Sequence, residues 1–127
     1  MNANAIITVT ARQEMARARA GLGSLPTIVG MAFGDGGVDG QGDPIAPATN
    51  ATALNNELLR KPLTAVTPLS ATTIQYACRL GTSELAGIDI SEIALYDSNG
   101  DLACIKTFPV KRKDSTEALT FTIDDIF

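Results

Sequence analysis

The residues of this chain with the clearest chemical potential are acids and glycines. Asp35, Asp39 and Asp43 recur every four positions in a glycine-rich stretch, and carboxylates gathered in this way are typical ligands of calcium or magnesium. Their order does not match the ligand positions of an EF-hand loop. We therefore favour a solvated loop over a metal site, and we expect no bound metal.

Two further patterns invite a chemical interpretation. Residues 97–101 place oxygen-bearing side chains at alternate positions, as an EF-hand loop begins, but such a loop has its glycine one position later and lies between helices. Residues 34–42 are rich in glycine but lack the Gly-Lys-Ser/Thr ending of a phosphate-binding loop. We interpret the first pattern as a hairpin turn and the second as a turn followed by a flexible loop, and we expect no cofactor.

The inventory for catalysis is short. The chain has no histidine, and no serine, cysteine or lysine lies in a recognisable activating context. Asp89 and Glu92 precede a predicted strand as a pair of acids that we expect on the surface. Cys78 and Cys104 are predicted to be small buried hydrophobic residues, the alternative being a disulfide between neighbouring strands. We predict that the protein is not an enzyme.

Composition limits the remaining classes. A chain of 127 residues with net charge −4 is expected to form one domain, residues 1–127, with an aliphatic core. The basic triplet 111–113 is too short for a nucleic-acid or membrane patch and is predicted to be a solvated turn. No apolar run is long enough to span a bilayer, and residues 1–5 lack a secretory signal. We expect synthesis in the cytoplasm of a bacterial host, with neither nucleic-acid binding nor membrane insertion.

Two helices are predicted. The first covers residues 11–20 after a short strand at 6–9, with Thr10 and Gln13 at the spacing of a capping box and Gly21 as its stop. The second is short and covers residues 53–60, where helix formers precede Pro62.

Strand patterns fill most of the remaining chain. Residues 28–33 form a nearly continuous apolar run, as in a strand covered on both faces. Residues 73–80 and 119–123 alternate cleanly, residues 63–69 are extended, and two apolar runs flank a turn at Asn99-Gly100. We predict an α+β fold with antiparallel β-sheet, two-layered and sandwich-like, carrying both helices and a flexible Gly/Asp-rich loop at about 34–50. A small sandwich with helical decorations is the alternative.

Four blocks of the chain combine recognisable motifs in a fixed order. They are the first helix at residues 10–20, the apolar strand ending in Gly-Asp-Gly within 28–37, a Thr-x-Leu-x-x-Glu-x-x-Arg stretch at 52–60 and an Ile-x-Glu-Ile-x-Leu-Tyr-Asp hairpin within 90–102. In this order, and with comparable gaps, the blocks resemble the N-terminal domain of phage tail-collar fibre proteins. They cover most of the chain.

The resemblance implies a structural protein of a phage or prophage tail that anchors or adapts tail fibres to the baseplate. It implies other tail, baseplate or fibre proteins as partners, a homo-oligomer for which a trimer is the first expectation, and a location in the virion tail. In such proteins this domain leads into a fibre shaft, whereas this sequence ends at Phe127, so a short adaptor, a minor tail component and a prophage product all stay open. The alternative function is a small host-surface receptor or glycan-binding module. The interaction residues that we expect are Gly34, Asp35, Gly36, Gly37, Asp39, Asp43, Glu57 and Arg60.

Overall fold

The polypeptide folds into two antiparallel β-sheets and one helix in the part that the computed structural model describes, residues 4–127. The five-stranded sheet has the order β1-β7-β6-β2-β3, and the three-stranded sheet has the order β4-β5-β8. In chain order the elements are β1 (Ala5–Ile7), α1 (Val9–Arg19), β2 (Ile28–Gly34), β3 (Glu57–Pro62), β4 (Ala65–Ser70), β5 (Thr73–Leu80), β6 (Ile88–Asp97), β7 (Leu102–Lys113) and β8 (Leu119–Ile126). The predicted antiparallel architecture is confirmed. Residues 1–3, which belong to the segment tested for a secretory signal, lie outside the described residues.

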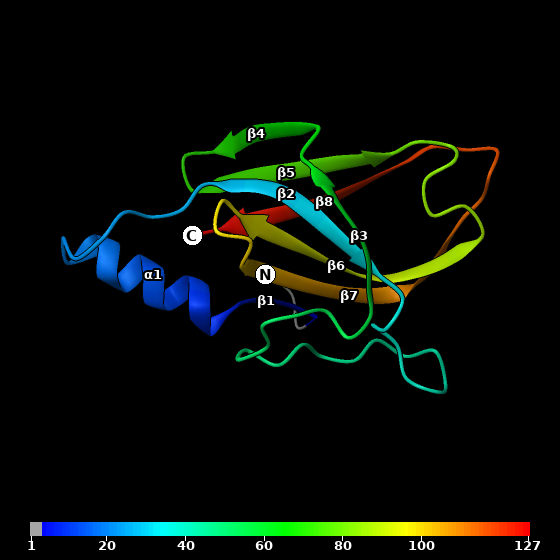
Figure 1. The fold of residues 1–127 in the computed structure, drawn as a ribbon, viewed down its shortest axis with the longest axis horizontal. Helices are drawn as coiled ribbons and strands as arrows, with labels where there is room; N and C mark the ends of the chain where they lie inside the picture. Colours follow the sequence, from blue (N-terminus) through cyan, green and yellow to red (C-terminus); the bar gives the residue numbers. More distant parts are fainter. Residues whose placement is uncertain (1–3) are drawn as a thin grey trace.

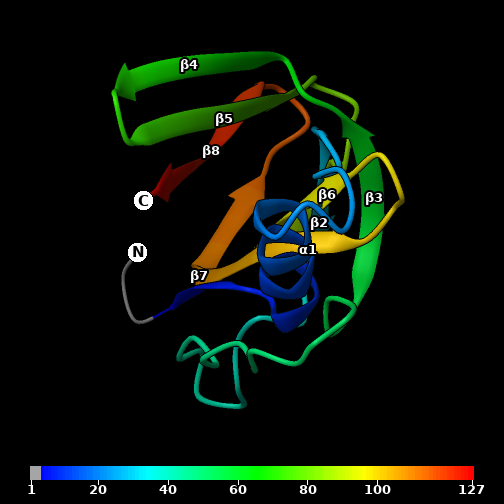
Figure 2. The same ribbon diagram turned by 90° about the vertical axis from the view of Figure 1, so that its left-hand side faces the viewer.

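The two sheets face each other, and α1 lies across one end of them (Figures 1 and 2). The core between the sheets includes Met31, Phe33, Cys78, Leu95 and Phe121. The rings of Phe33 and Phe121 meet edge to face with their centroids 5.4 Å apart, a favourable aromatic geometry. The side chains of this core come from both sheets, so the sheets are held together mainly by apolar burial.

The opposite face of the five-stranded sheet is covered by a second apolar cluster. Ala32, Ala94, Leu102 and Ile105 project from the sheet, and Leu54 packs on them from the long connection between β2 and β3. That connection runs beneath the sheet in Figure 2. Strand β2 is therefore buried on both faces, as its continuous apolar run predicts.

Helix α1 begins two residues earlier than the sequence pattern predicts. Its N-cap is Thr8, whose Oγ1 accepts a hydrogen bond from the Ala11 N–H at 3.1 Å and donates one to the Leu102 carbonyl at 2.8 Å. Thr8 is the N-cap in place of Thr10 because its buried hydroxyl also binds the helix to β7. The predicted stop is confirmed: Gly21 has φ +76° and the Leu22 N–H bonds the Arg17 carbonyl, which is a Schellman ending.

The hairpin of β6 and β7 forms around residues 97–101 as predicted. The Gly100 N–H donates to the Asp97 carbonyl, and the Asp97 side chain accepts from the N–H groups of Asn99 and Asp101. Only Gly100 has a positive φ in this turn, at 84°, and the register shifts between Leu95 and Tyr96. The turn is therefore of the bulged kind with one left-handed residue, and Asn99 needs no left-handed conformation.

The predicted helix over residues 53–60 is wrong. Leu54 enters the second apolar cluster, and the chain then continues as β3, which pairs with β2 along the edge of the five-stranded sheet. A helix here would leave the backbone groups of β2 without partners on that side. Local helix propensity, which is worth only tenths of a kcal/mol per residue, is overridden by this pairing.

The predicted solvated turn at 111–113 is also wrong. Strand β7 continues to Lys113, which is fully buried, and its Nζ donates to the carbonyl oxygens of Thr82 and Asp114. The other strand predictions are confirmed in β4, β5 and β8. Strand β8 pairs with β5 along its whole length, from Leu119 opposite Leu80 to Ile126 opposite Thr73.

Both cysteines are buried and free. Burial raises the pKa of the Cys104 thiol to about 12, so this side chain stays a neutral apolar group, as predicted for both cysteines. Among residues 4–127 no helix has the length and hydropathy needed to cross a membrane.

We expect Phe33→Ala to lower the free energy of unfolding by about 3–5 kcal/mol, because it opens a cavity between the two sheets and removes the contact with Phe121. Urea denaturation followed by circular dichroism measures the change. Val66→Ala is the control, since Val66 is exposed on β4, and it should change stability by less than about 0.5 kcal/mol. Equal effects of the two substitutions would contradict this assignment of the core.

Candidate functional site

A buried carboxylate organises one end of the five-stranded sheet. Glu92 lies in β6 between Gly34 of β2 and Thr107 of β7, and only 1% of its surface is exposed. Its Oε2 accepts hydrogen bonds from the N–H groups of Gly36 and Asn56, and its Oε1 accepts one from Asn55, each at 2.8 Å. Three backbone donors compensate for the removal of this charge from water.

Glu92 thus joins three segments that are far apart in the sequence. It ties the Gly-Asp-Gly-Gly turn after β2 to the segment before β3, and both to the middle of β6. Two amide side chains reinforce the junction: Asn55 Nδ2 donates to the Gly36 carbonyl at 2.8 Å, and Asn56 Nδ2 donates to Asp35 Oδ1 at 2.6 Å. The expectation that Glu92 lies on the surface beside Asp89 is wrong, because its strand faces this turn rather than solvent.

The turn requires glycines because the backbone of neighbouring segments lies too close to leave room for a Cβ. A Cβ at Gly37 would collide with the Ser91 carbonyl, and one at Gly34 would collide with the Asn56 carbonyl. The Gly37 N–H also donates to Ser91 Oγ at 2.9 Å. The predicted residues Gly34, Asp35, Gly36 and Gly37 are therefore brought together, and their immediate partner is the chain itself.

Asp39 and Asp43 lie further out, at the tip of the same loop. Asp39 Oδ1 accepts from the N–H groups of Gln41 and Asp43, and Val38 and Pro44 form a β-bridge below them. The loop returns to the sheet where the Ile45 N–H meets the Gly37 carbonyl and Thr107 Oγ1 donates to the Ile45 carbonyl. Asp39 thus shapes an exposed turn, while the base of the loop is fixed to the sheet.

Glu57 and Arg60 form a second group of predicted site residues. Arg60 Nε bonds Glu57 Oε2 at 2.7 Å, and Arg60 Nη1 donates to the Gly100 carbonyl at 2.8 Å. The guanidinium also lies 5.0 Å from the centre of the Tyr96 ring, and the hydrogen bond to Glu57 raises the pKa of Arg60 further. A register shift places Leu59 opposite Phe33 but Glu57 opposite Gly34, and this bulge allows Glu57 and Arg60 to meet along a strand.

One acidic cluster was not predicted as a unit. Carboxylate oxygens of Glu14, Asp97 and Asp101 lie within 4.8 Å of one another, the one such group in residues 4–127. Asp97 and Asp101 belong to the hairpin turn, and Glu14 comes from α1. Burial, followed by the charges of Asp97 and Asp101, raises the pKa of Glu14. Helical spacing alone does not show that α1 crosses this turn, so the cluster had no sequence signal.

The order of these segments along the chain matches a known family. The family model described as phage tail-collar fibre protein, N-terminal, matches residues 1–124. The chain belongs to this family. No curated protein and no solved structure shows a significant match. Membership in the tail-collar fibre family identifies a structural protein of the phage tail, located in the tail of the virion and associated with other tail proteins. The hydrogen bonds of Glu92 join residues from three of the four blocks that carried the resemblance, 28–37, 52–60 and 90–102.

We expect Glu92→Gln to lower the free energy of unfolding by about 2–3 kcal/mol, because an amide NH₂ replaces one charged acceptor among three backbone donors. Glu57→Gln is the matched control, since it removes a carboxylate of the same type from a partly exposed ion pair and should cost at most about 1 kcal/mol. Chemical denaturation of both variants tests the difference. A tolerated Glu92→Gln would refute the structural role of this carboxylate.

The close approach at Gly37 gives a separate prediction. Gly37→Ala should destabilise the domain by about 1–3 kcal/mol, because the new methyl group must displace the backbone of β6. Gly40→Ala is the control, since a Cβ at Gly40 meets nothing within 4 Å. Thermal unfolding of the two variants should differ by several degrees, and coincident melting curves would show that the turn yields freely.

Proposed function

We propose that this domain anchors or adapts a tail fibre to the baseplate, acting as a homo-oligomeric attachment module with a structural and not a catalytic role. The observation that supports this most directly is that β4 is an exposed edge strand. All of its residues are exposed, and it forms one edge of the three-stranded sheet, pairing only with β5. An edge strand of this kind offers free backbone donors and acceptors to another chain.

The side chains of β4 favour contact with protein. Val66 and Leu69 of this strand are each 53% exposed. Pro68 lacks an N–H and donates no backbone hydrogen bond, so backbone donors on this edge come from the other residues of β4. In Figure 2, β4 lies on the outside of the three-stranded sheet, away from the five-stranded sheet. Exposed apolar side chains on an open edge are a common feature of oligomer interfaces. A second copy of the chain, in a trimer, is the partner that we propose for this edge.

The loop after β2 is proposed as the contact with neighbouring tail proteins. Its base is fixed by Glu92 and Ser91, so the exposed tip with Asp39 and Asp43 is held in a defined position. Loops on a rigid sheet commonly carry recognition residues. Glu57 and Arg60 lie on β3, at the edge where this loop rejoins the sheet, and extend the proposed contact surface.

A receptor or glycan-binding module is less well supported. Such sites depend on exposed aromatic rings, and among the tyrosine and phenylalanine residues only Phe127 is exposed. Tyr96 lies beneath the Arg60 guanidinium, while Phe33 and Phe121 belong to the core. The attachment function therefore fits the distribution of aromatic residues better.

We expect the wild-type domain to form a homo-oligomer in solution and to co-purify with the baseplate or fibre proteins encoded beside it. Val66→Glu combined with Leu69→Glu should yield a folded monomer, because charges on the open edge oppose the pairing of β4 with another chain. Native mass spectrometry measures the mass of each form.

Leu22→Glu is the matched control, since Leu22 is similarly exposed but follows α1, and it should leave the oligomer intact. A wild-type monomer that also fails to bind the neighbouring tail proteins would overturn the proposed function.

A further inference from the structure

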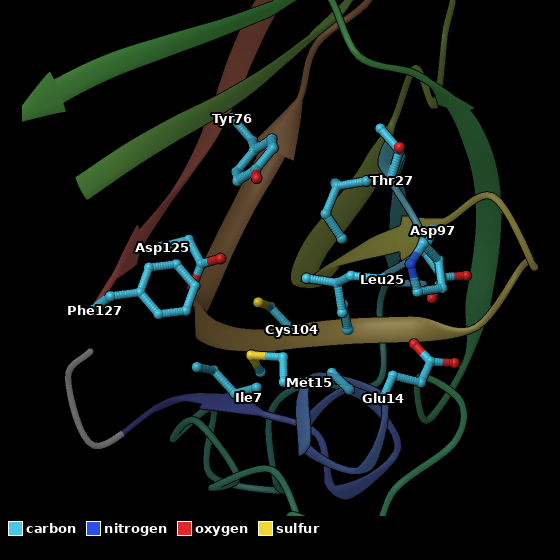
Figure 3. A pocket seen from close by; sticks show the side chains of 14 residues that line it. Ile7, Glu14, Met15, Leu25, Thr27, Tyr76, Asp97, Cys104, Asp125 and Phe127 are labelled. Carbon is cyan, nitrogen blue, oxygen red and sulfur yellow. The ribbon is translucent and has the colours of Figure 1, made fainter. Parts of the chain in front are cut away.

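A cavity of about 400 Å³ opens between α1, the turn of the β6–β7 hairpin and the end of β8. Its walls are mainly apolar. They include Ile7 and Met15 from the N-terminal part of the chain, Cys104 from β7, and Leu25 and Phe127 nearer the rim. Figure 3 shows these side chains surrounding the open space between the helix and the sheets. The cavity has the size of a small-ligand site and admits an aliphatic side chain.

One wall of the cavity carries a buried carboxylate with an oxygen that accepts no hydrogen bond. Asp125, in β8 opposite Ile74 of β5, is only 8% exposed. Its Oδ1 is the one buried side-chain oxygen or nitrogen of the described chain that has no hydrogen bond. In Figure 3 the carboxylate of Asp125 is turned into the cavity, between the Phe127 ring and Cys104. Burial raises its pKa, and the positive charge of the N-terminal amino group opposes this effect without supplying a hydrogen bond to Oδ1. Burial of the charged form therefore costs stability.

The opposite wall is also acidic. Glu14 and Asp97 line the cavity, and together with Asp101 they form the acidic cluster described above. Figure 3 places Glu14 and Asp97 on the far side from Asp125, with Leu25, Met15 and Cys104 between. The cavity therefore has an apolar middle and negative charge at both sides, a pattern complementary to a cation on an aliphatic chain.

We propose that this cavity receives a lysine side chain carried by a partner polypeptide, with its ammonium on Asp125 and its methylene groups against Met15 and Cys104. Lysine combines a compact ammonium with an unbranched aliphatic stem, which matches an apolar lining that ends at one buried carboxylate. Glu14 and Asp97 add to the negative potential that attracts the cation. The proposal rests on the attachment function, because it names the chemistry by which this domain holds another tail protein.

The experiment is an NMR titration that follows the methionine methyl groups of the wild-type domain. The probes are the peptides Ac-Ala-Lys-Ala-NH₂ and Ac-Ala-Nle-Ala-NH₂, which differ only in the ammonium, since norleucine keeps an aliphatic chain of similar length. We expect the lysine peptide to shift the Met15 signal and to bind roughly tenfold more tightly than the norleucine peptide. Met31 is the internal control, because it is buried in the core and does not line the cavity.

Asp125→Asn should abolish the preference for the lysine peptide while leaving the norleucine peptide unchanged, and it should unfold at the same or a higher urea concentration than the wild type. Asp124→Asn is the matched control, since Asp124 is exposed on the same strand, and it should keep the preference. Equal affinities of the two peptides for the wild type would overturn the proposal whether or not Asp125→Asn folds. Tighter binding of Ac-Ala-Arg-Ala-NH₂, or a Met15 shift produced by magnesium chloride and not by the lysine peptide, would overturn it as well.

Failure of this inference is distinguishable from failure of the attachment function. If the lysine peptide shows no preference but the domain still co-purifies with its neighbouring tail proteins, the cavity is not the docking site and the attachment function stands. If the peptide binds as expected and co-purification fails, the cavity assignment stands and the attachment function does not.

Discussion

The fold depends on a charge that has been removed from water and must be matched by the chain itself. The carboxylate of Glu92 meets the N–H groups of Gly36, Asn55 and Asn56, which no nearby strand satisfies. Carboxylate and amides are each costly to bury alone and favourable to bury together. This mutual requirement holds the Gly-Asp-Gly-Gly turn and the start of β3 against β6, and so closes the end of the five-stranded sheet.

Much of the fold could be predicted because its signals are local. Alternation over residues 73–80 depends only on which face of β5 is buried, and the stop at Gly21 depends only on a left-handed backbone. The turn at residues 97–101 likewise contains its own hydrogen-bond acceptor in Asp97. Patterns of this kind are readable without knowledge of distant partners.

The wrong predictions concern residues whose structure depends on partners far away along the chain. Residues 53–60 contain good helix formers, but their structure is decided by contacts with β2 and with Glu92. Glu92 lies more than thirty residues away along the chain. Lys113 can be buried because its ammonium donates a hydrogen bond to the carbonyl of Thr82, which is also distant along the chain. Glu92 itself gave no sign of burial, since a glutamate before an apolar run is commonly solvated. Of the predicted site, the sequence indicated the glycine turn and named Glu57 and Arg60, but it indicated neither the ion pair between these two residues nor the residue that joins the turn to the sheet.

The pairing of β5 with β8 has a mechanical consequence. The two strands pair without a register shift from Leu80 opposite Leu119 to Thr73 opposite Ile126. Beyond the last pair, the Phe127 N–H donates a hydrogen bond to the Thr72 carbonyl. Tension applied at Phe127 along the axis of β8 acts in shear, so it loads the rungs of this ladder together instead of peeling them apart one at a time. A module with this geometry resists tension along β8 better than tension that peels β8 away from β5.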